Sequence, residues 1–342
     1  ADAIAQNDPD RRIFAYRDGI LLKALRTTIQ LTYGGYFFPF NDAIRDKSLN
    51  TDELYHGVAI AYAETHDPGL LAIADWQGRT ILTADGLELA RDLAAGEAQP
   101  FAFGSMLLSD GPEGQQGAVA ILRHGEGPDH TALVAKNSSQ GMGHGHFDKL
   151  SWQFYDNGHE IVRDYGAARF LNIVAKDGGR YLPENESWAK QTVAHNALVV
   201  NEKSHFGGDV DLADSHAPTQ LHYSAEPELQ VTTARIDSAY PQERVTMLRT
   251  LALLDVAGLD APVVVDVLRA EGEGSATFDL PLHYSGHIIE TGFAVERNLA
   301  GRPVLGADHG YQHIWVDGTA APEADEAFIT WIFGGRFYTY RF

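Results

Sequence analysis

The stretch Pro262-Val263-Val264-Val265-Asp266-Val267-Leu268 is a short run of mostly β-branched apolar residues. Runs of this kind, bounded by clusters of glycine, asparagine and aspartate, are typical of strands in antiparallel sheets. Comparable runs recur from residue 117 to the last residues of the chain, at 118–122, 131–135, 198–200 and 328–333. This part of the sequence therefore predicts an all-β domain.

The residues before this region follow a helical pattern. Apolar side chains recur at roughly helical spacing between Ile13 and Ile29, and shorter helices fit residues 51–65, 69–76 and 85–95. Asp10 is a candidate cap for the first helix, and the short connections indicate stacked helical hairpins. A helical part followed by an all-β part predicts an α+β chain of two domains, at residues 1–98 and 99–342.

Composition and charge restrict the partners of this chain. The 342 residues carry 26 basic and 47 acidic side chains, a formal net charge of −21, which argues against nucleic acid as a partner. The acidic balance also argues weakly against an acidic polysaccharide, although the local site decides binding. No apolar run is long enough to predict a membrane span. The absence of cysteine excludes disulfides and thiolate metal sites, and it is compatible with the cytoplasm or the periplasm.

Three residues of the polar region between 137 and 206 form a candidate metal site. His146, Asp164 and His195 offer two imidazoles and one carboxylate, a common ligand set for Zn²⁺. They are far apart in the sequence, so each is expected on a different strand, where it would organise the sheet. The alternatives are three ordinary polar residues near turns, or a catalytic zinc, although no H-E-x-x-H helix motif is present.

Three further residues are candidates for contact with a substrate. His144 lies between two glycines, which leave space for a ligand, but it could equally be a second metal ligand or a surface histidine. Tyr181 follows a glycine pair, and its phenol could act as a general acid, although most tyrosines are packed aromatics. Arg169 could hold a carboxylate through two hydrogen bonds, but a lone arginine is usually solvated.

The run Lys-Asn-Ser-Ser-Gln-Gly-Met-Gly-His-Gly-His-Phe-Asp-Lys-Leu at residues 136–150 resembles the heparinase II/III-like β-domain. It is more closely similar to the oligoalginate lyases of polysaccharide lyase family 17. Residues 14–18, 37–42 and 191–196 strengthen this resemblance, which covers nearly the whole chain.

The resemblance implies the C-terminal part of an (α/α) toroid followed by a large antiparallel β-sandwich. It implies a periplasmic or secreted bacterial carbon–oxygen lyase that cleaves alginate oligosaccharides exolytically by β-elimination and releases an unsaturated monouronate. By position, His146, Asp164 and His195 match structural Zn²⁺ ligands. Tyr181 and His144 match active-site residues, and Arg169 and His144 match substrate-binding residues.

The resemblance also implies residues that this sequence lacks. An Asn-His pair and another tyrosine belong to the toroid upstream of this region. We therefore expect the chain to be a fragment that is truncated at its C-terminus. Its expected partners are the missing toroid half and an alginate substrate. A homodimer would add a second copy of the chain as a partner. The alternatives are a heparin or heparan sulfate lyase, and a non-catalytic zinc-containing carbohydrate-binding β-module. The preference for mannuronate or guluronate does not follow from the sequence.

Overall fold

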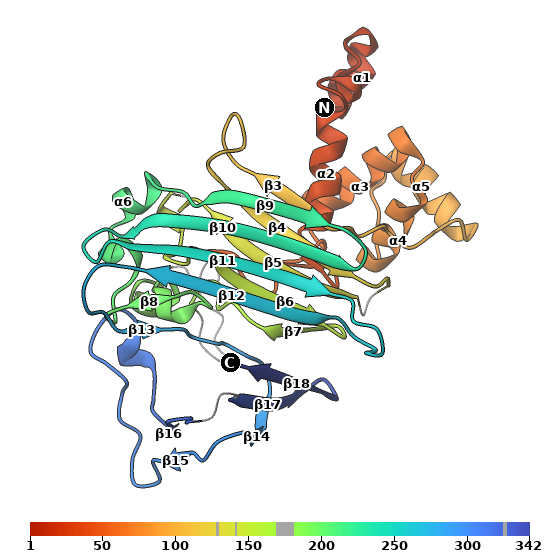
Figure 1. Ribbon diagram of the computed structural model, residues 1–342. Coiled ribbons are helices and arrows are strands. Elements are labelled where there is room, and N and C mark those ends of the chain that lie inside the picture. The colour runs from red at the N-terminus through yellow and green to blue at the C-terminus, as the bar shows by residue number, and fades with distance from the viewer. Residues whose placement is uncertain (128–129, 141, 169–180, 324–326) are drawn as a thin grey trace. The chain divides into compact units, whose positions relative to one another are not determined.

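The computed structural model describes residues 1–127, 130–140, 142–168, 181–323 and 327–342 (Figure 1). The chain divides into two compact units, one of residues 1–38 and 45–104 and the other of residues 39–44 and 105–342. The short segment 39–44 thus belongs to the second unit although it interrupts the first in sequence. The assignment of residues 1–98 to a toroid and of residues 99–342 to a β-sandwich domain stays a prediction.

The first unit is helical apart from one short hairpin. The helices expected over residues 51–65, 69–76 and 85–95 are confirmed. The side chains of Asp67 and Thr83 cap two of them by accepting hydrogen bonds from Gly69 N (2.9 Å) and Gly86 N (3.2 Å). The unit contains α1 (Asp2–Asn7), η1 (Pro9–Arg11), η2 (Ile13–Ala15), α2 (Ile20–Gln30), β1 (Thr32–Tyr33), β2 (Tyr36–Phe37), α3 (Asp52–Thr65), α4 (Pro68–Gln77) and α5 (Ala84–Ala94).

The expected start of the first helix at Asp10 is wrong. Asp10 lies in a 3₁₀ turn, and α2 begins only at Ile20. The residues between them cannot continue a right-handed helix because Arg12, Arg17 and Asp18 adopt positive φ angles of 46°, 47° and 56°. The apolar spacing that suggested one helix therefore belongs to one 3₁₀ turn, η2, and to the shorter α2.

The second unit is built on two antiparallel sheets, which confirms the prediction from the strand-like runs. The five-stranded sheet has the order β3-β4-β5-β6-β7, and the four-stranded sheet has the order β12-β11-β10-β9. The first comprises β3 (Met106–Ser109), β4 (Gly117–His124), β5 (Thr131–Ser138), β6 (Ser151–Asp156) and β7 (His159–Val162). The second comprises β9 (Thr219–Ala225), β10 (Leu229–Tyr240), β11 (Val245–Leu254) and β12 (Val263–Glu271).

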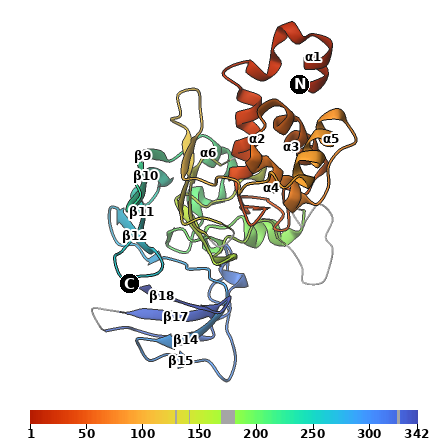
Figure 2. The same cartoon turned by 90° about the vertical axis from the view of Figure 1, so that its right-hand side faces the viewer.

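These two sheets pack face to face, and Figure 2 shows them as two layers. Leu133 and Trp152 of the five-stranded sheet meet Leu251 and Leu253 of the other, and all four are buried. Burial of such side chains contributes about 25 cal/mol per Å² of apolar surface. A second core, which includes Phe147, lies between the four-stranded sheet and the loops that carry the polar residues described below.

A third, smaller sheet has the order β14-β17-β18 and is also antiparallel. Its strands are β14 (His287–Thr291), β17 (Phe328–Phe333) and β18 (Arg336–Arg341). The other elements of the unit are η3 (Met142–His144), η5 (Asn185–Ala189), η6 (Thr192–Ala194), β8 (Val199–Val200), η7 (His205–Gly208), α6 (Val210–Asp214), β13 (Phe278–Asp279), β15 (Glu296–Arg297), η8 (Tyr311–His313) and β16 (Gly318–Thr319). Among the described residues, the helices are too short or too polar to cross a membrane.

Candidate functional site

The connection between β5 and β6 carries the two histidines of the glycine-histidine run. Gly145 separates them, and a Cβ atom at this position would lie 1.6 Å from the backbone oxygen of Gln140. By contrast, a Cβ atom at Gly143 would meet nothing within 4 Å. Gly145 is therefore required by the close approach of two backbone segments. The result is that the His144 side chain is 60% exposed, whereas that of His146 is fully buried.

Asp42 joins these two histidines. One carboxylate oxygen, Oδ2, lies 2.9 Å from His144 Nδ1, and the other, Oδ1, lies 3.1 Å from His146 Nε2. Asn185 donates a third hydrogen bond, of 2.7 Å, to Oδ1. Burial alone would raise the pKa of Asp42, but the hydrogen bonds from His146, Asn185 and His144 hold it well below its ordinary value. Asp42 therefore remains ionised and fixes the orientation of both rings.

Asp164 holds His195 in the same way. Its Oδ2 atom lies 2.9 Å from His195 Nδ1, and its Oδ1 atom accepts a hydrogen bond of 2.9 Å from Gly166 N. Both side chains are buried. Burial opposes ionisation of the carboxyl group, but the neighbouring imidazole outweighs it and keeps the pKa of Asp164 low. Despite its own burial, the charge of Asp164 raises the pKa of His195.

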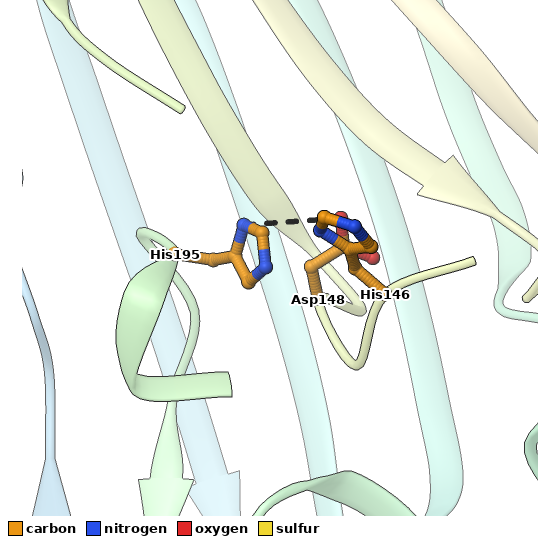
Figure 3. A group of neighbouring side chains, drawn as sticks. All are labelled: His146, Asp148 and His195. Atoms are coloured by element: carbon orange, nitrogen blue, oxygen red, sulfur yellow. Dashed lines mark ion pairs between the residues drawn. The ribbon is translucent and has the colours of Figure 1, made fainter. Parts of the chain in front are cut away.

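His146, Asp148 and His195 form a compact group of potential metal ligands (Figure 3). Each offers one ligand atom within 4.8 Å of the others, and Asp148 Oδ2 lies 4.0 Å from His195 Nδ1. Among the described residues, His146 Nδ1 and His195 Nε2 are buried and have no hydrogen-bond partner. Buried imidazole nitrogens are normally paired, and the second nitrogen of a metal-bound histidine commonly donates to a carboxylate. The donor set therefore fits a divalent metal ion.

The carboxylate of Asp148 also forms a buried ion pair with Lys136, whose Nζ atom donates to Asn41 as well. Asn41 and Asp42 come from the segment 39–44, and the backbone of Ala43 accepts a hydrogen bond of 3.1 Å from Ala167 N. These polar contacts explain why a segment far away in sequence belongs to the second unit.

The structure brings together four of the candidate residues, because Asp42 links the exposed ring of His144 to the buried cluster of His146, Asp164 and His195. His146 and His195 lie side by side with a ring-centroid distance of 5.2 Å, and Asp164 contacts His195. Tyr181 is 71% exposed. Arg169 lies outside the described residues. The identification of Asp164 as a ligand stays a prediction, because its contact to His195 Nδ1 also suits an outer partner of a metal-bound imidazole.

Sequence reasoning missed Asp42, Asp148 and Lys136 as members of this site. Asp148 and Lys136 lie within the quoted run at residues 136–150, two and ten residues from His146. A carboxylate two residues after a candidate ligand was a usable signal. Asp42 had only an indirect signal, its place in the run 37–42 that strengthened the family resemblance, because it lies more than a hundred residues from the histidines in a region that reads as helical.

Residues 106–335 match the heparinase II/III-like, C-terminal family. The chain belongs to this family. The match covers most of the second unit, including the paired sheets and the histidine site.

Two curated proteins are similar to this heparinase II/III-like chain over all of its 342 residues. One is named alginate lyase, from Stenotrophomonas maltophilia (strain K279a), and the other exo-oligoalginate lyase, from Saccharophagus degradans (strain 2-40). Each is 53% identical to this chain, which covers 46% of the relative's length. The chain thus spans about half the length of these relatives.

Solved structures support the fold assignment. The heparan sulfate lyase HepC from Pedobacter heparinus matches 89% of this chain and 38% of its own, with a TM-score of 0.53 and 15% identity. A heparinase III gene product with methylated lysines matches 78% of this chain and 34% of its own, with a TM-score of 0.52 and 16% identity. At such low identity these likenesses establish a common fold of helices and antiparallel sheets.

Proposed function

We propose that this chain is part of a lyase that cleaves alginate oligosaccharides by β-elimination. The observation that carries the proposal is the 53% identity, over the whole chain, to proteins named alginate lyase and exo-oligoalginate lyase. By analogy with the second name, the enzyme acts exolytically on alginate oligosaccharides, and by the resemblance to polysaccharide lyase family 17 it releases an unsaturated monouronate.

β-Elimination removes the C5 proton of a uronate and breaks the bond from C4 to its oxygen. The adjacent carboxylate makes the C5 proton weakly acidic, so the site must stabilise the negative charge that develops there. The exposed ring of His144 is suited to this role because Asp42 holds its Nδ1 atom and leaves Nε2 for a substrate. In the proposal, Tyr181 supplies a phenol for proton transfer, and Arg169 binds a carboxylate on the sugar.

We further propose that the metal site holds a structural Zn²⁺. His146 and His195 would be ligands together with Asp164, which contacts His195 at 2.9 Å, or with Asp148, whose ligand atom lies within 4.8 Å of those of both histidines. When bound, the ion would cross-link the loop after β5 to the loop before β8. The ring of His146 also shares Asp42 with His144, so the site would fix the position of the substrate-facing histidine.

The test of the catalytic proposal is turnover by the protein expressed in its complete reading frame. Tyr181→Phe is expected to lower kcat on polymannuronate oligosaccharides by about two orders of magnitude or more, because general acid–base catalysis contributes this much. Tyr16→Phe is the control, since Tyr16 is another exposed tyrosine, in the first unit. Near-normal kcat in the Tyr181 variant would remove this residue from the mechanism.

The second candidate function, cleavage of heparin or heparan sulfate, rests on the fold family alone. Absorbance of the new double bond on polymannuronate and on heparan sulfate separates the two substrates. Binding of oligouronates without any unsaturated product would instead favour a non-catalytic carbohydrate-binding module.

The remaining parts of the proposal concern the longer protein. We propose that a toroid half with an Asn-His pair and a tyrosine completes the active site, that the protein is periplasmic or secreted, and that it forms a homodimer. Cell fractionation and light scattering of the purified protein test the last two points.

A further inference from the structure

A groove of about 780 Å³ lies in the second unit, apart from the histidine site. Its floor is formed by Trp152 and Phe154 of β6 and by Val162 of β7. One wall is the start of β12, at residues 263–266, and the other is β18 with Trp331 of β17. The floor and both walls are therefore made of strands, and their lining is rich in aromatic and β-branched side chains.

Both walls are edge strands. β12 is the last strand of the four-stranded sheet and pairs with β11, and β18 is the last strand of its sheet and pairs with β17. Among the strands that the structure describes, neither is paired on the side that faces the groove. Val263, Val265 and Val267 of β12 are 36–53% exposed. An edge strand of this length and composition is a template for pairing with another strand.

The two layers of the sandwich also differ in width. One sheet has five strands and the other has four, and the groove covers β6 and β7 next to β12. In a sandwich, neighbouring strands are about 4.8 Å apart, the layers are about 10 Å apart, and each residue extends a strand by about 3.3 Å. The product of these spacings is a volume of roughly 160 Å³ per residue. The groove thus holds roughly five residues, which is the length of an ordinary strand.

Three of the charged side chains at the groove, Asp156, Asp266 and Arg336, are already paired within the protein. Asp156 accepts hydrogen bonds from Thr131 (3.0 Å), Arg336 (2.9 Å) and Tyr338 (2.9 Å). Asp266 is bound by Arg249 through two hydrogen bonds, of 2.8 and 2.6 Å. An acidic sugar would find Arg336 engaged with Asp156 there, whereas a peptide strand needs only the edge of β12 and an apolar floor.

We propose that an extended polypeptide segment occupies this groove, pairs with β12 and completes the second layer of the sandwich. The segment belongs to the same polypeptide. The curated relatives have the length to supply it, since over half of each has no counterpart in this chain. A second copy of this chain is a poorer source, because its edge strand would bring the rest of its sheet with it, whereas the groove between β12 and β18 has room for about one strand.

Amide hydrogen exchange of the protein expressed in its complete reading frame tests this proposal. β9 is the matched control, because it is the opposite edge of the same sheet and also pairs on one side only among the described strands. We expect the amides of β12 to exchange at least about tenfold more slowly than those of β9. Equal exchange rates for the amides of β12 and β9 would overturn the proposal. Protection of β12 that increases with protein concentration would also overturn it, because this result would assign the groove to a second copy of the chain.

A pair of variants makes the test independent of the overall stability. Phe154→Asp places a charge on the groove floor and is expected to reduce the protection of β12 at least about tenfold. Leu221→Asp, at an exposed position of β9, is expected to leave the protection of β12 unchanged. If Phe154→Asp does not fold, Val263→Asp at the groove rim replaces it. Unchanged protection of β12 in the folded floor or rim variant would refute an inserted strand.

Discussion

A buried arginine connects the four-stranded sheet to the histidine site, and its replacement gives a sharp test of the packing. Arg249 Nη1 donates to the backbone oxygens of Leu150 (2.8 Å) and Asn196 (2.5 Å), while its other nitrogens bind Asp266. The side chains of Arg249 and Asp266 are only 3% and 6% exposed. Leu150 and Asn196 stand two residues after Asp148 and one after His195, so this single guanidinium fixes two loops of the site.

We expect Arg249→Met to destabilise the second unit by roughly 5 kcal/mol. Leaving Asp266 as an uncompensated buried charge costs about 3–5 kcal/mol. Each backbone oxygen that loses its donor adds about 1–3 kcal/mol, although such costs are not fully additive. The double variant Arg249→Met with Asp266→Leu removes the charge penalty and leaves only the two unpaired carbonyls. It is therefore expected to regain about 3 kcal/mol and to remain roughly 2 kcal/mol less stable than the wild type.

Urea unfolding followed by tryptophan fluorescence measures these differences, because Trp152, Trp188, Trp315 and Trp331 all lie in the second unit. The matched control is Arg244→Met, since Arg244 makes an exposed ion pair with Glu273 and its loss should cost no more than about 1 kcal/mol. The reasoning fails if Arg249→Met costs as little as the control. It also fails if the double variant is no more stable than the single one.

Three other perturbations have definite expected outcomes. Gly145→Ala should destabilise the protein by at least about 2 kcal/mol, because the new methyl group collides with Gln140 O, whereas Gly143→Ala should be tolerated in the same thermal melt. Burial lowers the pKa of His205 to about 3, from 6.5 when unfolded. As the pH falls, the imidazole is therefore protonated in the unfolded chain before it is protonated in the folded protein. The free energy of unfolding should decrease between pH 6.5 and about 3 by on the order of 5 kcal/mol, and His205→Gln should reduce this loss. A chelator should lower the Tm of the metal-loaded protein, and His146→Ala should remove that response; an unchanged Tm would argue against a structural ion.

The regular elements could be predicted from the sequence because their signals are local. Apolar runs identified β4, β5, β12 and β17 but not β10 and β11, the longest described strands, and apolar spacing identified α3 to α5 within one residue at each end. The region between Asp10 and Ile20 failed because periodicity does not report the positive φ angles that stop a helix. The pairing of strands into layers also lay beyond the sequence, since it depends on contacts between distant residues such as Trp152 and Leu251.

The candidate site shows the same division between local and distant information. His144, His146 and their glycines form one short motif, and Gly145 has a physical reason to be there, although the expected reason was space for a ligand. Asp42 could not be found in this way. It reaches the histidines only because the segment 39–44 leaves the helical unit and joins the sheets, and no periodic pattern records that exchange.

The charge balance of the site gives a further reason to expect a divalent cation. The carboxylates of Asp42, Asp148 and Asp164 are buried beside the two imidazoles, and the pKa of each is held below its ordinary value. Lys136 pairs directly with Asp148, while burial lowers the pKa of nearby Lys149 to about 7, so its charge is partial at neutral pH. When both imidazoles are neutral, as binding of a metal ion requires, the cluster carries an excess of between one and two negative charges. Because buried charge without compensation is costly, an ion of charge +2 between His146 and His195 would neutralise this excess where two unpaired nitrogens are available to bind it.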